Sequence, residues 1–183
     1  MNILYIFLAF MCLWLMWFII TYNSFIYLRS FVQEAWSGID VQLKRRYDLI
    51  PHLVEVVKGY SFHEKNIIDN IVSMRALSMR STGPEGKEQA ELELSGALKS
   101  LFALAENYPN LKANENFLAL QKDLSAIEQD LQLARRYYNG TVRNYNNKIL
   151  SFPAHLVASF MHLQPVSYFE IELQEKSAPS IKF

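Results

Sequence analysis

The side chains that could do chemistry gather on two predicted long helices. Beside the apolar stripe of the first lie Asp40, Arg45, Arg46 and Asp48. Near the end of the other, arginines, amides and phenols crowd together, namely Arg135, Arg136, Tyr138, Asn139, Tyr145 and Asn146. Buried polar groups in a bundle must be paired, and such pairs can select one alignment of the helices. We interpret them as a structural polar network in which Arg135 or Arg136 pairs with Asp40 or Asp48. The alternative is a polar patch that binds a partner.

The spacing of the histidines argues against a metal centre. His63-Glu64 begins like a zinc-protease helix, but Ile67 stands where the second histidine would be needed. None of the 4 histidines follows a glutamate at the spacing of di-iron bundles. The sequence also has no phosphate-cradling glycine loop and no serine in a nucleophile elbow. It therefore predicts no catalytic residue, no cofactor and no bound metal, and hence a protein that is not an enzyme.

The composition of the chain narrows the class of protein further. The 183 residues allow an anchor and one helical domain, and the formal net charge is +0. Lysines and arginines are spread along the chain, so no nucleic-acid surface is predicted. Cys12 is the single cysteine, which excludes a disulfide within the chain. An aromatic set at helical spacing, including Trp36, Tyr47 and Phe102, indicates packing in the core.

The first residues predict a membrane anchor. No charged side chain precedes Arg29, and residues 3–20 are almost all apolar. About 20 such residues in a helix cross a hydrocarbon layer of ~30 Å. The aromatic anchors are Tyr5, Trp14, Trp17 and Tyr22. A cleavable signal peptide is the alternative, but the segment lacks a basic start and an A-x-A site.

The location of basic residues predicts the orientation. Arg29, Lys44, Arg45 and Arg46 all follow the apolar segment. Positive residues favour the cytoplasmic side, so we expect a single-pass membrane protein whose soluble domain is cytoplasmic.

Apolar residues then recur every three or four positions without a break, which predicts that the membrane helix continues as the first bundle helix. Pro51 either ends this helix or kinks it, and the stripe beyond Pro51 favours a kink. Lys58-Gly59 is typical of a helix end. Ser61 and Glu64 fit a capping box that starts a second helix reaching about Met79, with Ile67, Ile68, Ile71, Val72 and Leu77 buried.

Residues 81–86 predict an exposed loop, and residues 87–107 a third helix. Asn114 is a plausible cap for the longest helix, in which Phe117, Leu124, Leu131, Tyr138 and Tyr145 share one heptad position. Pro153 opens a short helix that either closes the bundle as a lid or lies on lipid. The predicted fold is all-α: an N-terminal transmembrane helix continuing into an elongated antiparallel helical bundle of about four long helices plus a short C-terminal helix. The predicted boundaries are 1–24 for the anchor, 25–170 for the bundle and 171–183 for a tail.

Five segments of the chain form a recognisable set. They are EAWSGIDVQLKRRYDLIP at 34–51, VKGY at 57–60, YPNLKANENF at 108–117, ARRYYN at 134–139 and YFE at 168–170. Together they resemble the LemA family, which implies that the expected span lies in the bacterial inner membrane. The resemblance covers nearly the whole chain in the expected order. It implies a bacterial membrane protein with one span, a helical soluble domain and no established enzymatic activity. Genes of the family often lie near those for a TPM-domain protein or a membrane metallopeptidase, which the resemblance suggests as partners.

The function expected from these observations is a membrane-anchored scaffold or adaptor of the bacterial envelope. The lipid bilayer is its first partner, and self-association into a homo-oligomer is expected because the span and the coiled-coil-like helices can both present stripes to copies of themselves. The alternatives are an accessory subunit of a membrane protease or quality-control system and a membrane-shaping protein.

Overall fold

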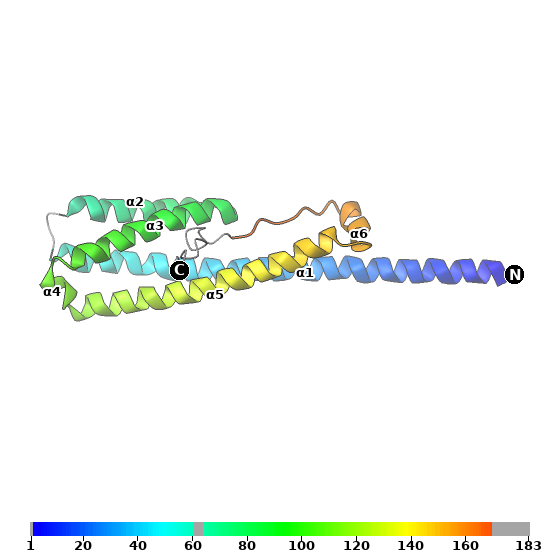
Figure 1. Ribbon diagram of the computed structural model, residues 1–183, viewed down its shortest axis with the longest axis horizontal. Helices are drawn as coiled ribbons and strands as arrows, with labels where there is room; N and C mark the ends of the chain where they lie inside the picture. Colours follow the sequence, from blue (N-terminus) through cyan, green and yellow to red (C-terminus); the bar gives the residue numbers. More distant parts are fainter. Residues whose placement is uncertain (1, 61–63, 170–183) are drawn as a thin grey trace, which may run out of the picture. The chain divides into compact units, whose positions relative to one another are not determined.

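The computed structural model describes residues 2–60 and 64–169. Every regular element in these ranges is an α-helix, as Figure 1 shows. In chain order they are α1 (Asn2–Lys58), α2 (Lys65–Arg80), α3 (Gly83–Ala105), α4 (Pro109–Lys112), α5 (Glu115–Leu150) and α6 (Ala154–Phe160). The predicted all-α class is therefore confirmed, with one helical turn, α4, that the sequence did not reveal.

Packing divides the chain into two compact units. Unit 1 is made of the chain up to Leu43 and of residues Gln129–Tyr168, and unit 2 contains Lys44–Glu128. Helices α1 and α5 each contribute residues to both units. The predicted boundaries of anchor, bundle and tail stay a prediction, and the predicted tail lies outside the described residues.

Helix α1 is unbroken over 57 residues and contains Pro51 in its interior. The predicted continuation from the apolar segment into the bundle is thus confirmed, as is the helix end at Lys58. Phe25, Val32, Ile39, Leu43, Ile50, Leu53 and Val57 form its buried stripe. Their spacing of three, four or seven residues places them on one helical face.

In unit 1, the early part of α1 runs antiparallel to the late part of α5 (Figure 1). Lys148 of α5 donates a hydrogen bond to Ser24 of α1, and the rings of Trp36 and Tyr138 meet edge to face with centroids 5.4 Å apart. Leu131, Tyr138, Val142, Tyr145 and Ile149 are the buried apolar and aromatic residues of α5 here. Their removal from water is the main source of stability for this pair.

In unit 2, α2 and α3 lie side by side as a hairpin (Figure 1). The buried Ser78 hydroxyl donates to the carbonyl oxygen of Ala90 at 3.0 Å, which satisfies a polar group inside the contact. Ile68 and Ile71 of α2 are buried as predicted, but the predicted burial of Val72 and Leu77 is wrong, because they are 48% and 45% exposed. The buried face of α2 follows positions 68, 71 and 78, and Val72 and Leu77 lie off it.

The predicted loop at 81–86 is shorter than expected, because α3 begins at Gly83 instead of near residue 87. Gly83 has a φ of 73°, a left-handed conformation that suits glycine, and Pro84 follows in the first helical turn. Proline lacks an N–H that this turn would leave unpaired anyway, and its ring fixes φ near the helical value. The Gly-Pro pair therefore starts a helix here.

The start of α5 agrees with the prediction. The side-chain oxygen of Asn114 accepts a hydrogen bond from the backbone N–H of Phe117 at 3.0 Å, which is the geometry of an N-cap. Every residue of the predicted heptad position from Phe117 to Tyr145 is buried. The predicted capping box of α2 includes residues 61–63, which lie outside the described part, and the Glu64 carboxylate accepts a hydrogen bond from the Tyr108 hydroxyl.

Candidate functional site

A buried ion pair lies in unit 2 around Arg46. The helical period places Arg46 beside Leu43 and Ile50 on the buried stripe of α1, and its residue surface is 4% exposed. Its Nη1 donates to Oε2 of Glu91 on α3 at 2.9 Å, and its Nη2 donates to Oγ of Ser95 at 2.8 Å. The carboxylate of Glu128 on α5 lies 3.4 Å from Nη1. One guanidinium thus joins three helices of unit 2.

The Glu91 carboxylate is paired on both oxygens. Its Oε1 accepts a hydrogen bond from the Tyr47 hydroxyl, while Oε2 accepts from Arg46. A carboxylate and a guanidinium that are buried and mutually bonded present no atom to a substrate. Burying both charges costs desolvation energy, which their mutual attraction offsets only in a matched geometry such as this one. We infer that the cluster favours one alignment of the helices of unit 2.

Pro51 removes one backbone hydrogen-bond donor from α1. A proline has no N–H, so the carbonyl oxygen of Tyr47, four residues earlier, does not receive the hydrogen bond that another residue at position 51 would donate. Arg75 of α2 supplies a donor in its place, because its Nε donates a hydrogen bond to that oxygen at 2.8 Å. This contact explains how a proline sits inside a packed helix of unit 2 with its freed carbonyl satisfied.

The predicted polar network is distributed over both units. Of the predicted members, Arg46 and Tyr145 are buried, and Asp40, Arg135 and Asn139 are half-buried; Arg45, Asp48 and Arg136 are exposed. The pairing of Arg135 or Arg136 with Asp40 or Asp48 stays a prediction. Glu91, Ser95 and Glu128, which surround Arg46, were missed. The burial of Glu91 could have been predicted from the sequence, since Glu91 lies one turn before Leu94 on the apolar stripe of α3.

The end of α5 holds the segment that follows α6 in unit 1. The Asn146 side chain donates to the carbonyl oxygen of Val166 and accepts from its N–H, both at 2.9 Å. The buried Tyr138 donates its hydroxyl hydrogen to the Ser167 carbonyl oxygen at 3.0 Å. Burial raises the pKa of the Tyr138 phenol above its usual value, because the charged phenolate is poorly solvated there. The side chains of Tyr138 and Asn146 therefore hold the backbone of residues 166–167 against α5.

Most of the predicted membrane anchor is exposed. Tyr5, Trp14 and Tyr22 are 61%, 56% and 40% exposed, and Trp17 is half-buried. An 18-residue window of α1 has a mean hydropathy of 2.6, and 0% of it is buried. A core helix of a soluble protein with this composition would be mostly buried. The exposed apolar segment therefore indicates a membrane-associated protein.

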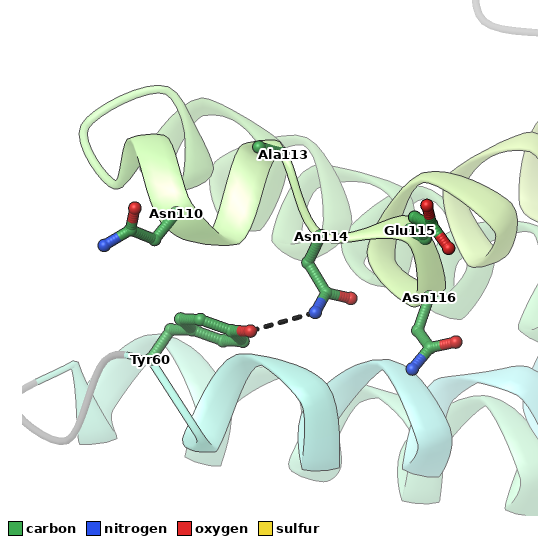
Figure 2. Close-up of a pocket in the computed structure, with 6 residues that line it drawn as sticks. All are labelled: Tyr60, Asn110, Ala113, Asn114, Glu115 and Asn116. Carbon is green, nitrogen blue, oxygen red and sulfur yellow. Dashed lines mark hydrogen bonds between the residues drawn. The ribbon is translucent and has the colours of Figure 1, made fainter.

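A shallow depression of about 570 Å³ lies where the end of α1 meets α4 and the start of α5 (Figure 2). Its lining residues are Tyr60, Asn110, Ala113, Asn114, Glu115 and Asn116. The Asn114 amide nitrogen donates to the Tyr60 hydroxyl at 2.9 Å, as the dashed line in Figure 2 shows. Asn110 and Asn116 extend on the same side as Tyr60, while Glu115 points away.

The asparagine amides and the exposed Tyr60 phenol that line the depression suit the binding of a polar partner. An asparagine side chain offers both donors and acceptors but is neutral, so it is a poor acid or base. Within residues 2–60 and 64–169, no group of three or more His, Cys, Asp and Glu residues could hold a metal ion. The depression therefore has the chemistry of a site that hydrogen-bonds a polar surface, with Tyr60 as a flat apolar contact.

Comparison with known proteins gives a consistent result. The profile of the LemA family matches residues 35–183. A protein named Protein LemA from Metamycoplasma hominis is 29% identical over 144 residues, which is 76% of this chain and 64% of that protein. Magnetosome protein MamQ 2 of Paramagnetospirillum magneticum is 23% identical over 183 residues, covering 86% of this chain and 66% of the relative. Magnetosome protein MamQ of Magnetospirillum gryphiswaldense is 24% identical over 174 residues, covering 81% and 64%. The chain thus spans a little under two thirds of the length of these relatives.

Proposed function

Because this chain belongs to the LemA family, we propose that it is a membrane-anchored scaffold without a reaction of its own. In this proposal the exposed apolar part of α1 crosses the bacterial cytoplasmic membrane. Units 1 and 2 carry surfaces that hold other proteins or further copies of the chain at the membrane.

The continuity of α1 carries this proposal. The same 57-residue helix contains the exposed apolar window and a buried stripe that extends to Val57. Separating the apolar window from the packed residues would require breaking backbone hydrogen bonds within a helix, and Pro51 is the only proline in it. A partner bound to either unit is therefore held to the bilayer by covalent and helical continuity.

The depression around Tyr60 supports binding over catalysis. It is open and polar, and its asparagines lie on helix ends whose backbone is fixed by the Asn114 cap. We assign it as a docking surface for a protein partner that offers backbone or side-chain hydrogen-bonding groups. A membrane metallopeptidase or a TPM-domain protein is a partner of this kind, in which case the chain acts as an accessory subunit.

Self-association forms part of the proposal. In unit 1, Tyr27, Phe31, Leu133 and Tyr137 are exposed by 70%, 45%, 58% and 54%. Large apolar side chains at this density on one pair of helices suit contacts with a second copy. We also propose a cytoplasmic location for both units, because Arg29 and the basic residues after it follow the apolar window.

One experiment tests the scaffold directly. The full chain is extracted from native membranes in polymer-bounded lipid discs, and the mass and stoichiometry of its complexes are measured. The double variant Asn110→Arg/Asn116→Arg obstructs the depression, while Asn147→Arg adds a charge to an exposed asparagine of unit 1 as the matched control.

We expect a stoichiometric partner that is lost from the double variant and retained by the control. A peptidase in that position favours the accessory role. A monomeric mass without a partner contradicts the scaffold, and catalytic turnover by the purified chain contradicts the claim that it has no reaction. Deformation of liposomes by the chain alone points instead to membrane shaping.

A further inference from the structure

A group of large apolar side chains surrounds α6 without being covered by protein. Leu150, Phe152, Leu156 and Phe160 are 69%, 85%, 55% and 72% exposed. Leu156 and Phe160 are four residues apart and lie on one face of α6. The opposite side of the helix packs into unit 1, where Val157 and Ala158 are each 1% exposed. The lid predicted from sequence therefore accounts for one face of α6 and leaves the other uncovered.

This uncovered group adjoins the apolar segment of α1. The ring of Phe160 meets the ring of Phe18 edge to face, with centroids 5.7 Å apart. Phe18 in turn stacks on Trp14 at 6.3 Å, and Trp14 lies 6.4 Å from Trp17. A continuous aromatic surface thus leads within unit 1 from the predicted membrane-spanning residues to α6. Tryptophan, which this surface contains at positions 14 and 17, is enriched at the boundary between hydrocarbon and water.

The charge pattern separates this region from its surroundings. No Asp, Glu, Lys or Arg occurs between Lys148 and Glu170, or before Arg29 in α1. The cation closest along α5 is Lys148, which bonds to Ser24 and lies 5.6 Å from the centre of the Phe25 ring. Ser24 is six residues after Phe18, or about 9 Å along the helix. Charge therefore begins about two helical turns beyond the Phe18–Phe160 contact.

From these observations we propose that α6 and its flanking residues lie in the interface of the bilayer, with Leu150, Phe152, Leu156 and Phe160 inserted among the lipids. The occupant of the uncovered face is lipid, because the contact of Phe160 with the half-buried Phe18 joins that face to the exposed apolar segment of α1. The insertion is driven by apolar burial, since α6 has no Lys or Arg to meet anionic headgroups. It rests on the membrane anchoring in the proposed function, and it fixes the depth of α1 by placing Phe18 at the boundary.

Fluorescent labels in the full chain test the proposal. An environment-sensitive probe is attached to a single cysteine in place of Leu156, with Cys12 replaced by serine. Ser37→Cys is the matched control, because Ser37 is exposed in the same unit, lies eight residues after Arg29 on α1 and is not part of the proposed contact between copies. The unaltered chain labelled at Cys12, which is exposed in the middle of the apolar window, reports the anchor itself. Each protein is placed in nanodiscs of phosphatidylcholine, with and without spin-labelled lipid.

We expect blue-shifted emission and loss of intensity with spin-labelled lipid at positions 12 and 156, and neither at position 37. Added salt leaves the signal at 156 unchanged, since the insertion needs no charge. Water-like emission at 156 together with quenching at 12 overturns the proposal and leaves the anchor intact. A blue shift at 156 without lipid quenching also overturns it, because a second copy then covers α6. Absence of quenching at 12 overturns the anchor and this proposal together.

Discussion

At the scale of single residues, the polar side chains of this protein are used to hold helices and backbone together. Arg46 and Glu91 are buried and bonded to each other, and Asn146 binds both backbone groups of Val166. Each hydrogen bond replaces the water that a polar group loses on folding, so the group is not buried without a partner. These three polar side chains thus have structural partners within the protein.

Replacing Glu91 by glutamine is expected to reduce the free energy of unfolding by about 3–5 kcal/mol, because Arg46 then remains buried without its closest negative partner. The partly exposed Glu128 at 3.4 Å favours the lower end of this range. Urea unfolding of the full chain in detergent micelles, followed by circular dichroism, measures the change. The control Glu93→Gln alters an exposed glutamate of α3 and should change stability by less than about 0.5 kcal/mol.

The double variant Arg46→Met/Glu91→Leu sharpens this prediction. Removing both charges avoids an unpaired ion, so it should cost less than Glu91→Gln alone. A double variant that is less stable than the single one would show that the pair contributes net stability instead of alignment.

The raised pKa of the Tyr138 phenol predicts that the free energy of unfolding falls at alkaline pH. Its folded pKa is raised, so folding favours the neutral form, and the contribution is fully present below the unfolded value of about 10. It is lost as the pH rises from there through the folded pKa. Urea unfolding at a series of pH values above 8 should therefore show a fall in stability that is smaller for Tyr138→Phe. Equal falls for both chains would assign the effect to other groups.

At the scale of helices, α1 depends on a donor from another helix. Pro51 removes the N–H that would bind the Tyr47 carbonyl oxygen, and Arg75 of α2 replaces it at 2.8 Å. The extra donor allows α1 to continue past a residue that often ends helices. The N-cap of α5 by Asn114 and the Gly-Pro start of α3 likewise show local residues that set helix boundaries.

Arg75→Ala should therefore destabilise unit 2 by about 1–3 kcal/mol, since a buried carbonyl loses a charged donor. In a chain that also carries Pro51→Ala, the restored N–H binds the Tyr47 carbonyl, so the same change should cost less. Denaturant unfolding of the four chains of this cycle gives the coupling between the two positions. Arg80→Ala, at an exposed arginine of α2, is the control. Equal costs of Arg75→Ala in both backgrounds would contradict the proposed compensation.

At the scale of the whole molecule, the protein joins a segment suited to lipid with two helical units through α1. The exposed window of α1 has a mean hydropathy of 2.6 and contains no charged side chain. Its fit to a bilayer rests on that lack of charge, because each charged residue near the centre of a spanning helix costs about 2.5–3.5 kcal/mol on insertion scales.

The double variant Leu8→Arg/Leu13→Arg should therefore lose most of its membrane insertion, with a combined cost of roughly 5–7 kcal/mol. Extraction of membranes with alkaline carbonate measures the fraction of chain that remains inserted. The control Leu118→Arg/Leu133→Arg places the same charges at exposed leucines outside the window and should stay in the membrane fraction. Retention of both variants to the same extent would contradict a spanning role for the window.

The sequence alone determined the properties that depend on order along one helix. The apolar window, the buried heptad positions of α5 and the Asn114 cap follow from spacing and from local hydrogen bonds, which need no distant partner. The family was also recognisable from motifs such as that of residues 34–51.

Only the tertiary structure decided which polar residues meet. Arg46 pairs with Glu91 from a helix 45 residues later, and Arg75 reaches Tyr47 across 28 residues. Both contacts depend on how the helices of unit 2 are packed, and helical periodicity gives the face of a residue but not its partner. The same reason applies to α6, since its sequence shows an apolar face, while the contact of Phe160 with Phe18 places that face beside the apolar segment of α1.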